Sequence, residues 1–365
     1  MNAKTITGIT VVILLIIASI ATSGEERERA WVPLGVVLPL TGDAASYGEH
    51  ARNGVEIAKE KAAKDFGIVF DLRYEDSQIK PALAASAAQK LISVDGVQFV
   101  IGFGSGETLA MCPITEAAQR VLFSSGSSPA ITGCGNYTFR NYPSDVFQGQ
   151  ALAKKVAERG LRNIALLYIN NDYGNGLRNE FVKHFSGATP VNEGHVPQTR
   201  DFRTVVAKVK AAHPDAVVLI SQMAEASRLL DQLHEQGVSV PIFGSEALKD
   251  KALFETAKPE SLADLFMLFT ASYNGPEASA FKRAYLARFG KEPGAFADYV
   301  HDNVLMLAKV LQNCKQKDAE CVKNALYETT LIGATGRISF DSNGDVRDKP
   351  YELYRAESEE FVTEN

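Results

Sequence analysis

Four short loops rich in glycine and hydroxyl residues offer groups that could bind an anion. They are residues 41–48 (TGDAASYG), 102–108 (GFGSGET), 124–128 (SSGSS) and 244–247 (GSEA). Glycine lets the backbone approach a ligand closely, and the free N–H groups at a helix start attract negative charge. The side chains that would add donors are Ser105, Thr108, Ser125 and Ser127. Together they suit a carboxylate, although each serine taken alone is better explained as a helix cap.

The same loops lack the motifs of nucleotide-binding proteins and enzymes. Glu107 stands where a dinucleotide fingerprint requires its third glycine, and no Gly-Lys-Ser/Thr sequence follows. No serine lies in a Gly-x-Ser-x-Gly elbow, and His234 lacks the second histidine of a zinc-protease motif. Residues 341–345 begin like a calcium loop, but Val346 replaces the required glycine, which favours a hairpin turn. We therefore expect no catalysis, no cofactor and no metal site.

The loops follow short apolar runs that alternate with helical patterns. The expected strands are residues 34–38, 69–74, 97–101, 121–123, 164–168, 216–220, 240–243, 336–340 and 351–354. The expected helices are residues 48–64, 81–94, 108–119, 176–185, 202–211, 224–236, 277–289, 295–312 and 319–327. This order predicts an α/β protein of two doubly wound lobes. Open α/β sheets bind ligands at the carboxyl ends of their strands, which is where the four loops lie.

The N-terminus has the pattern of a secretory signal peptide. Lys4 precedes an apolar stretch that ends at Ile20, and small residues follow it, so we assign residues 1–23 to the signal. An uncleaved membrane anchor is the alternative. Export places the protein in the periplasm or outside the cell. The chain carries a net charge of −6, which argues against a nucleic-acid partner, and we expect a monomer.

Four cysteines in an exported chain favour disulfide bonds. They are Cys112, Cys134, Cys314 and Cys321, and four cysteines allow three connectivities. We prefer the pairs 112–134 and 314–321 because each pair falls within one expected lobe. A metal site is disfavoured since no Cys-x-x-Cys pair is present.

Six segments, taken in order and spacing, resemble the periplasmic leucine/isoleucine/valine-binding proteins of ABC importers. They are residues 35–48 (GVVLPLTGDAASYG), 98–104 (QFVIGFG), 124–132 (SSGSSPAIT), 171–176 (NDYGNG), 243–247 (FGSEA) and 340–345 (FDSNGD). The resemblance implies a type I, Venus-flytrap fold whose lobes are joined by a three-crossing hinge. On that basis lobe 1 is mainly residues 31–145 and lobe 2 mainly 146–270 and 335–365. Residues 248–272 and 274–330 are shared between the lobes by the crossings.

The resemblance also implies roles for named residues. Ser105 or Gly106, with Ser125, Gly126 and Ser127, would hold the carboxylate of the ligand. Glu246 would pair with its ammonium group, since a buried cation needs a paired anion. Tyr47 and Tyr173 match aromatic residues of the cleft, one on each lobe. Gln222 stands where an aromatic residue is expected, which leaves the side-chain preference open.

The function that follows is capture of an amino acid for an ABC importer, with a membrane permease as partner. A branched-chain or other apolar amino acid is expected to be held by closure of the lobes. A receptor of the same fold for a related small acid, amide or aromatic compound, in transport or sensing, is the alternative.

Overall fold

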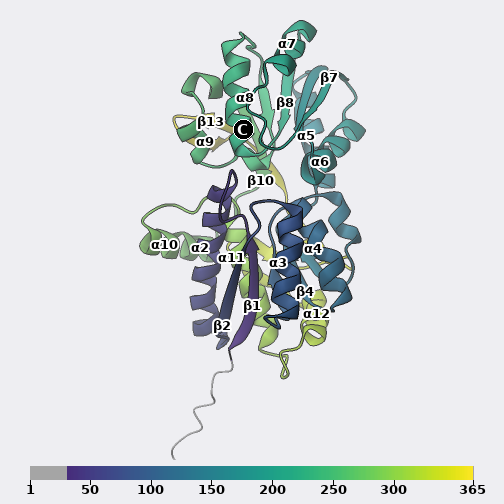
Figure 1. Ribbon diagram of the computed structural model, residues 1–365. Helices are drawn as coiled ribbons and strands as arrows, with labels where there is room; N and C mark the ends of the chain where they lie inside the picture. Colours follow the sequence, from purple (N-terminus) through teal and green to yellow (C-terminus); the bar gives the residue numbers. More distant parts are fainter. Residues whose placement is uncertain (1–30, 365) are drawn as a thin grey trace, which may run out of the picture.

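The computed structural model describes residues 31–364, which form two α/β lobes stacked end to end (Figure 1). The signal-peptide prediction lies outside these residues. Within them, no helix is both long and apolar enough to span a membrane.

The first lobe is built on a parallel five-stranded sheet of order β2-β1-β3-β4-β5. Its strands are β1 (Val32–Leu38), β2 (Phe70–Asp76), β3 (Phe99–Ile101), β4 (Val121–Ser124) and β5 (Thr138–Arg140). The sheet is covered on both faces, so its strands read as apolar runs rather than as an apolar–polar alternation. Along β1, Val36 and Leu38 join one hydrophobic core while Val37 joins another.

Helices pack on both faces of this sheet (Figure 1). One face carries α2 (Ala45–Lys61), α11 (Ala297–Leu311) and α12 (Ala319–Glu328). The other carries α3 (Pro81–Ser93) and α4 (Ser105–Ala117). A π-helical turn, Ala62–Phe66, continues α2, and α10 (Pro276–Phe289) packs beside α2. The hairpin of β11 (Leu331–Gly333) and β12 (Gly336–Ile338) completes the lobe.

The second lobe contains a seven-stranded sheet of order β14-β13-β10-β9-β8-β6-β7. Its strands are β6 (Asn163–Ile169), β7 (Ala188–His195), β8 (Ala216–Ile220), β9 (Ile242–Gly244), β10 (Leu265–Thr270), β13 (Tyr351–Glu357) and β14 (Glu360–Thr363). The last two strands are antiparallel to their neighbours. Helices α5 (Asp145–Glu158) and α6 (Asp172–His184) cover one face. Helices α7 (Arg203–Ala212), α8 (Met223–Glu235) and α9 (Ala252–Thr256) lie on the other.

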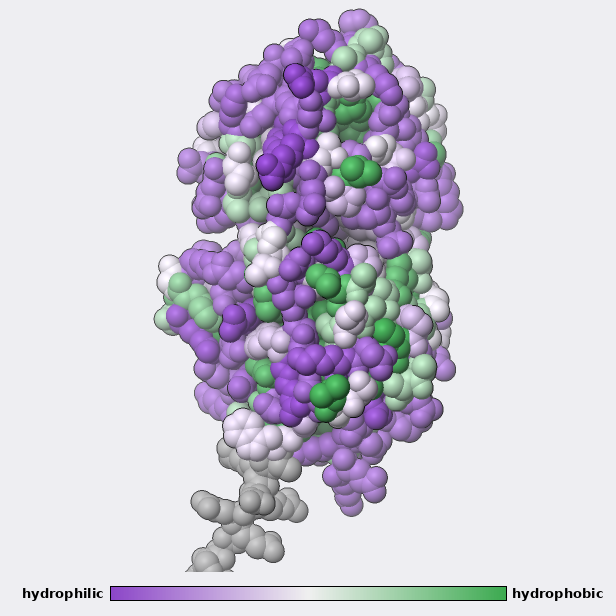
Figure 2. Space-filling model, in the orientation of Figure 1, coloured by the Kyte–Doolittle hydropathy of each residue, from purple (hydrophilic) through white to green (hydrophobic). Residues whose placement is uncertain are grey.

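The chain passes between the lobes at three places in the described range: after β5, after β10 and before β13. These crossings form a narrow waist between the two masses of the molecule (Figure 2). Residues 335–346, assigned above to lobe 2, instead lie in lobe 1. Phe340 packs on Phe139, with ring centroids 5.2 Å apart, and Asp345 bridges to Arg140. Of residues 335–364, those from Tyr351 onward, in β13 and β14, belong to the second sheet.

Both preferred disulfides are present, Cys112–Cys134 and Cys314–Cys321. Each pair lies within one lobe, as expected, and both pairs lie in lobe 1, so the preferred pairing is confirmed. Phe340 and Val346 pair antiparallel across residues 341–345, which confirms the expected hairpin turn.

Candidate functional site

A cavity of about 130 Å³ lies where the two lobes meet, and all nine residues to which the resemblance gives a role line it. Those from lobe 1 are Tyr47, Ser105, Gly106, Ser125, Gly126 and Ser127, and those from lobe 2 are Tyr173, Gln222 and Glu246. Their roles toward a ligand stay predictions. Thr108, the other expected donor, does not line the cavity, and its hydroxyl instead donates to the Gly104 carbonyl at 2.7 Å at the start of α4 and contacts the Ser124 hydroxyl. Residues that line the cavity without having been predicted are Ile79, Pro81, Phe103, Gly104, Glu107, Asn171, Asp172, Pro197, Ala247 and Phe296.

The lobe 1 wall is formed by the start of α4 and the loop after β4. Helix α4 begins at Ser105, three residues earlier than expected, so Ser105 and Gly106 belong to its first turn, whose N–H groups have no partner within the helix. The Ser105 Oγ accepts hydrogen bonds from the backbone N–H groups of Ser127 and Ser128, at 3.1 and 3.0 Å. Its own proton remains available to a ligand. These bonds tie the two serine-containing loops into one surface.

The free hydroxyl in this wall is that of Ser125. Its Oγ is buried and has no hydrogen-bond partner among the described residues. A buried hydroxyl without a partner is costly, and a ligand that accepts its proton would remove that cost. Gly126 permits the tight loop, since a Cβ there would lie 2.8 Å from the carbonyl oxygen of Gly104.

Arg140 holds this loop from behind and was not predicted. It lies at the end of β5 and is only 1% exposed. Its Nη1 donates to the carbonyl oxygens of Ser127 and Ser128, at 3.1 and 2.8 Å, and its Nε donates to Asp345 at 2.8 Å. The sequence carried no local signal for this role, because the loop and Asp345 come from distant segments.

The lobe 2 wall presents one buried carboxylate, Glu246, at the start of a 3₁₀ turn (Glu246–Leu248) after β9. Its Oε2 accepts hydrogen bonds from Gln148 Nε2 at 2.5 Å and from the Tyr173 hydroxyl at 3.0 Å. Burial raises the pKa of Glu246 to about 7, although these donors oppose the shift. No Lys, Arg or His lines the cavity within the described chain, so the carboxylate has no cationic partner there.

Gln148 and Asp145 were missed because α5 was not predicted. Both side chains are fully buried at the start of α5, which Ser144 caps by accepting from the N–H of Val146. Asp145 lies behind the wall, where its backbone N–H donates to the carbonyl of Ser127 at 2.8 Å. Burial and the nearby Glu246 raise the pKa of Asp145 well above its usual value.

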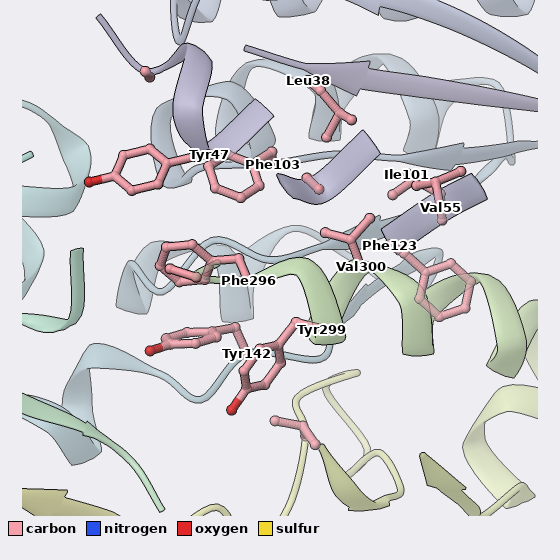
Figure 3. Close-up of a cluster of buried hydrophobic side chains, with 14 of the residues drawn as sticks. Leu38, Tyr47, Val55, Ile101, Phe103, Phe123, Tyr142, Phe296, Tyr299 and Val300 are labelled. Atoms are coloured by element: carbon pink, nitrogen blue, oxygen red, sulfur yellow. The ribbon is translucent and has the colours of Figure 1, made fainter. Parts of the chain in front are cut away.

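Three aromatic rings, Tyr47, Phe103 and Phe296, line a further side of the cavity and lie together in one cluster (Figure 3). Phe103 stacks on Tyr47 with centroids 6.3 Å apart, and Phe296 meets both rings edge-on, at 5.9 Å from Tyr47 and 5.4 Å from Phe103. The Tyr47 hydroxyl points out of the cluster toward lobe 2, where it donates to the carbonyl of Ala247. Phe296 comes from the N-terminus of α11, nearly two hundred residues after Phe103, so no local pattern indicated it.

Gln222 lies at the N-cap of α8 on the lobe 2 side and is half-buried. Its position in the cavity lining rather than outside it keeps it available to a ligand side chain. Among the described residues no group of three or more acidic, histidine or cysteine side chains is arranged to hold a metal ion.

Comparisons with known proteins agree with this architecture. The model of the family described as "Periplasmic binding protein" matches residues 32–360. A leucine-, isoleucine-, valine-, threonine- and alanine-binding protein of Pseudomonas aeruginosa is 28% identical over 344 residues, which cover 91% of this chain and 92% of that protein. A Leu/Ile/Val-binding protein of Rhizobium johnstonii is 26% identical and covers 99% of both chains.

Solved structures share the fold. A leucine-binding protein of Thermotoga maritima superposes with a TM-score of 0.86 at 24% identity, over 92% of this chain and 98% of that one. A solute-binding protein of an ABC transporter from R. palustris, in complex with benzoate, gives 0.85 at 18% identity, over 92% and 95%. The two lobes, the hinge and a family match over nearly the whole described chain lead to one conclusion: this chain belongs to the periplasmic binding protein family, a family of non-catalytic solute-binding proteins.

Proposed function

We propose that this protein captures an α-amino acid in the cavity between its lobes, as the solute-binding component of an ABC importer. The observation that carries the proposal is the position of Glu246. This buried carboxylate has no cationic partner in the cavity lining and faces the serine-containing loops of lobe 1 across a single small cavity. A zwitterionic ligand would supply the missing cation and use the opposite donors.

Each end of an amino acid finds matching groups. The ligand carboxylate accepts from the Ser125 hydroxyl, from Ser105 or Ser127, and from the first-turn N–H groups of α4. The ligand ammonium donates to Glu246, which Gln148 and Tyr173 hold in place. Hydrogen bonds between charged groups are about twice as strong as neutral ones, and burial in the cavity increases their contribution.

The ligand side chain is placed against the aromatic residues Tyr47, Phe103 and Phe296. Apolar rings favour a branched-chain or other apolar side chain. The cavity volume of about 130 Å³ limits the ligand to a small molecule, since a cavity of roughly 150 Å³ accommodates benzene.

The aromatic wall also supports a second candidate, a small aromatic acid without an amine. Such a ligand would use the serine loops and the rings but leave Glu246 without a cation. Whether binding requires the Glu246 carboxylate therefore distinguishes the two candidate ligands. Either kind of ligand is compatible with a periplasmic location, with delivery to a membrane permease and with a sensory role.

The test is a screen of the common amino acids and benzoate by thermal unfolding, followed by calorimetry. A ligand at a hundredfold excess over its Kd should stabilise the protein by about 2.7 kcal/mol. In the Glu246→Gln variant, binding of an amino acid should weaken at least a hundredfold, whereas benzoate binding would be spared. Glu235→Gln, an exposed substitution at the end of α8, serves as the control. Absence of stabilisation by any amino acid would overturn the proposal.

A further inference from the structure

Glu107 is a buried carboxyl group in the cavity lining, and the proposed amino-acid site assigns it no contact with the ligand. It lies in the first turn of α4, is 1% exposed, and lines the cavity beside Ser105 and Gly106. Neither of its carboxyl oxygens has a hydrogen-bond partner of good geometry among the described residues. Buried polar groups in proteins are almost always hydrogen-bonded, so an orphaned carboxyl at a ligand cavity needs a partner.

The Ser77 hydroxyl interacts with the Glu107 carboxyl, but neither carboxyl oxygen makes a hydrogen bond of good geometry with it. Its Oε2 lies close to the backbone of Gly104, where a Cβ would come within 2.1 Å of it, and the Ile79 side chain lies beside the same point. The charged side chains that line the cavity with it are Asp172 and Glu246, both acidic. Burial raises the pKa of Glu107 to about 8, with nearby Asp76 adding to the shift and the Ser77 hydroxyl opposing it. At neutral pH the group is therefore mainly an uncharged carboxylic acid, which can both donate and accept a hydrogen bond.

We propose that Glu107 is a specificity-determining residue that forms a hydrogen bond with a hydroxyl or amide group on the side chain of the bound amino acid. This inference rests on the proposed capture of an amino acid, and it replaces the purely apolar side chain suggested by the rings with one that also carries a polar group. The preferred side chain combines the size of a branched-chain residue with a polar group, as in threonine or asparagine. The carboxylate and ammonium of the ligand are already matched by the serine loops and Glu246, which leaves the side chain to reach Glu107.

The neighbouring groups fit such a side chain. Ile79 and Pro81 line the cavity with Glu107 as apolar neighbours, and Gln222 adds a half-buried amide from lobe 2. A site that is built around a buried hydrogen-bonding group discriminates strongly against an isostere that lacks the matching group, because its own polar group is then left unpaired. A purely apolar pocket discriminates only weakly between isosteres.

The test compares near-isosteric pairs of ligands, threonine with valine and asparagine with leucine, by isothermal titration calorimetry at pH 7. The wild type should bind the polar member of each pair at least tenfold more tightly. In Glu107→Leu this preference should disappear or reverse. Glu107→Gln, which keeps a donor and an acceptor in nearly the same volume, should retain it and serves as the matched control.

The outcomes separate this inference from the proposed function. If the wild type binds valine and leucine as tightly as their polar partners, amino-acid capture stands and the role of Glu107 is wrong. A polar preference that survives in Glu107→Leu also overturns it. If no amino acid binds the wild type, both proposals fail. Should Glu107→Leu not fold, the wild-type comparison alone still decides against the inference when the polar preference is absent.

Discussion

The hydroxyl of Tyr47 in lobe 1 donates a hydrogen bond to the carbonyl oxygen of Ala247 in lobe 2, at 2.5 Å. The same hydroxyl accepts from the backbone N–H of Met223 at 3.1 Å. One side chain of α2 therefore satisfies two backbone groups of the opposite lobe at the edge of the cavity. Both bonds join the lobes, so they exist only when the lobes are in contact. We infer that Tyr47 stabilises the closed arrangement in which a ligand is enclosed.

Tyr47→Phe should keep the stacked ring and remove both interlobe bonds. A typical hydrogen bond contributes about 0.5–1.5 kcal/mol net, so the ligand Kd should rise roughly fivefold to 150-fold for the two together. Most of the change should appear as faster dissociation, which stopped-flow fluorescence would measure. Tyr74→Phe, which removes a bond to Glu56 within lobe 1, is the matched control. An unchanged dissociation rate would contradict the role of Tyr47.

The raised pKa of Glu246, about 7, predicts that binding depends on pH. An ammonium group requires the ionised carboxylate, so affinity for the amino acid should increase as pH rises from 5.5 toward 8. Well below the pKa the increase should approach tenfold per pH unit, because the ionised fraction of Glu246 changes by that factor. Calorimetry at a series of pH values measures it. A flat profile would show that Glu246 does not receive the ammonium.

The stability of the unliganded protein should change in the opposite direction. An acid whose pKa is raised by folding holds its proton in the native state when the unfolded chain has lost it. The free energy of unfolding should therefore fall as pH rises from about 4.5 through 7. Glu246→Gln should reduce this slope without removing it, because Glu107 is shifted in the same direction. Urea unfolding of both proteins at pH 5.5 and pH 8 provides the measurement, and equal slopes would argue against the shift.

Arg140 should be as important for ligand binding as the residues that line the cavity. Arg140→Met removes both donors to the Ser127–Ser128 loop and leaves Asp345 without its ion pair. Breaking a buried pair from one side costs about 3–5 kcal/mol of stability, and we expect binding to weaken at least tenfold because the loop loses its support. Asp345→Asn should weaken binding less, since Arg140 keeps its bonds to the loop carbonyls. The comparison requires urea unfolding and calorimetry of both variants, and equal losses of affinity would contradict the distinction.

The parts of the site that could be predicted from the sequence are the short loops that follow apolar strands. Glycine and serine at the ends of β3 and β4 indicated an anion-binding wall, because backbone N–H groups and hydroxyls are usable by a ligand whatever the wider fold. Those loops, Tyr47, Tyr173, Gln222 and Glu246 do lie around one cavity. The prediction that these residues share one site between two lobes came from the family resemblance, since no spacing in the sequence specifies it.

Other parts of the fold and of the site were not predicted from the sequence, for physical reasons that can be named. Helix α5, which was not predicted, places two polar residues, Asp145 and Gln148, among the residues it buries. Strand β7 is the edge strand of its sheet and buries only Val191 fully, so it lacks the apolar run that marks a buried strand. Phe296 reaches the cavity in a left-handed conformation, with φ of 67°, from a helix far along the chain. Such contacts depend on tertiary packing alone.

The two disulfides should differ in their contribution to stability. Cys112–Cys134 links residues 22 apart and ties α4, whose first turn lines the cavity, to the segment after β4. Cys314–Cys321 spans only seven residues beyond the end of α11. Loop-closure entropy in the unfolded chain predicts losses of about 3 kcal/mol for the double variant Cys112→Ser/Cys134→Ser and about 2 kcal/mol for Cys314→Ser/Cys321→Ser.

Urea unfolding of both double variants and of the wild type, without reductant, measures these losses. Removing the first bond should also lower ligand affinity, because it frees the helix that presents Ser105 and Gly106, whereas removing the second should leave affinity unchanged. Wild-type protein treated with reductant provides a control without substitutions, and it should lose at most the sum of the two effects. A larger loss from the shorter loop would show that native packing around Cys314, which is 1% exposed, outweighs the entropy of the unfolded chain.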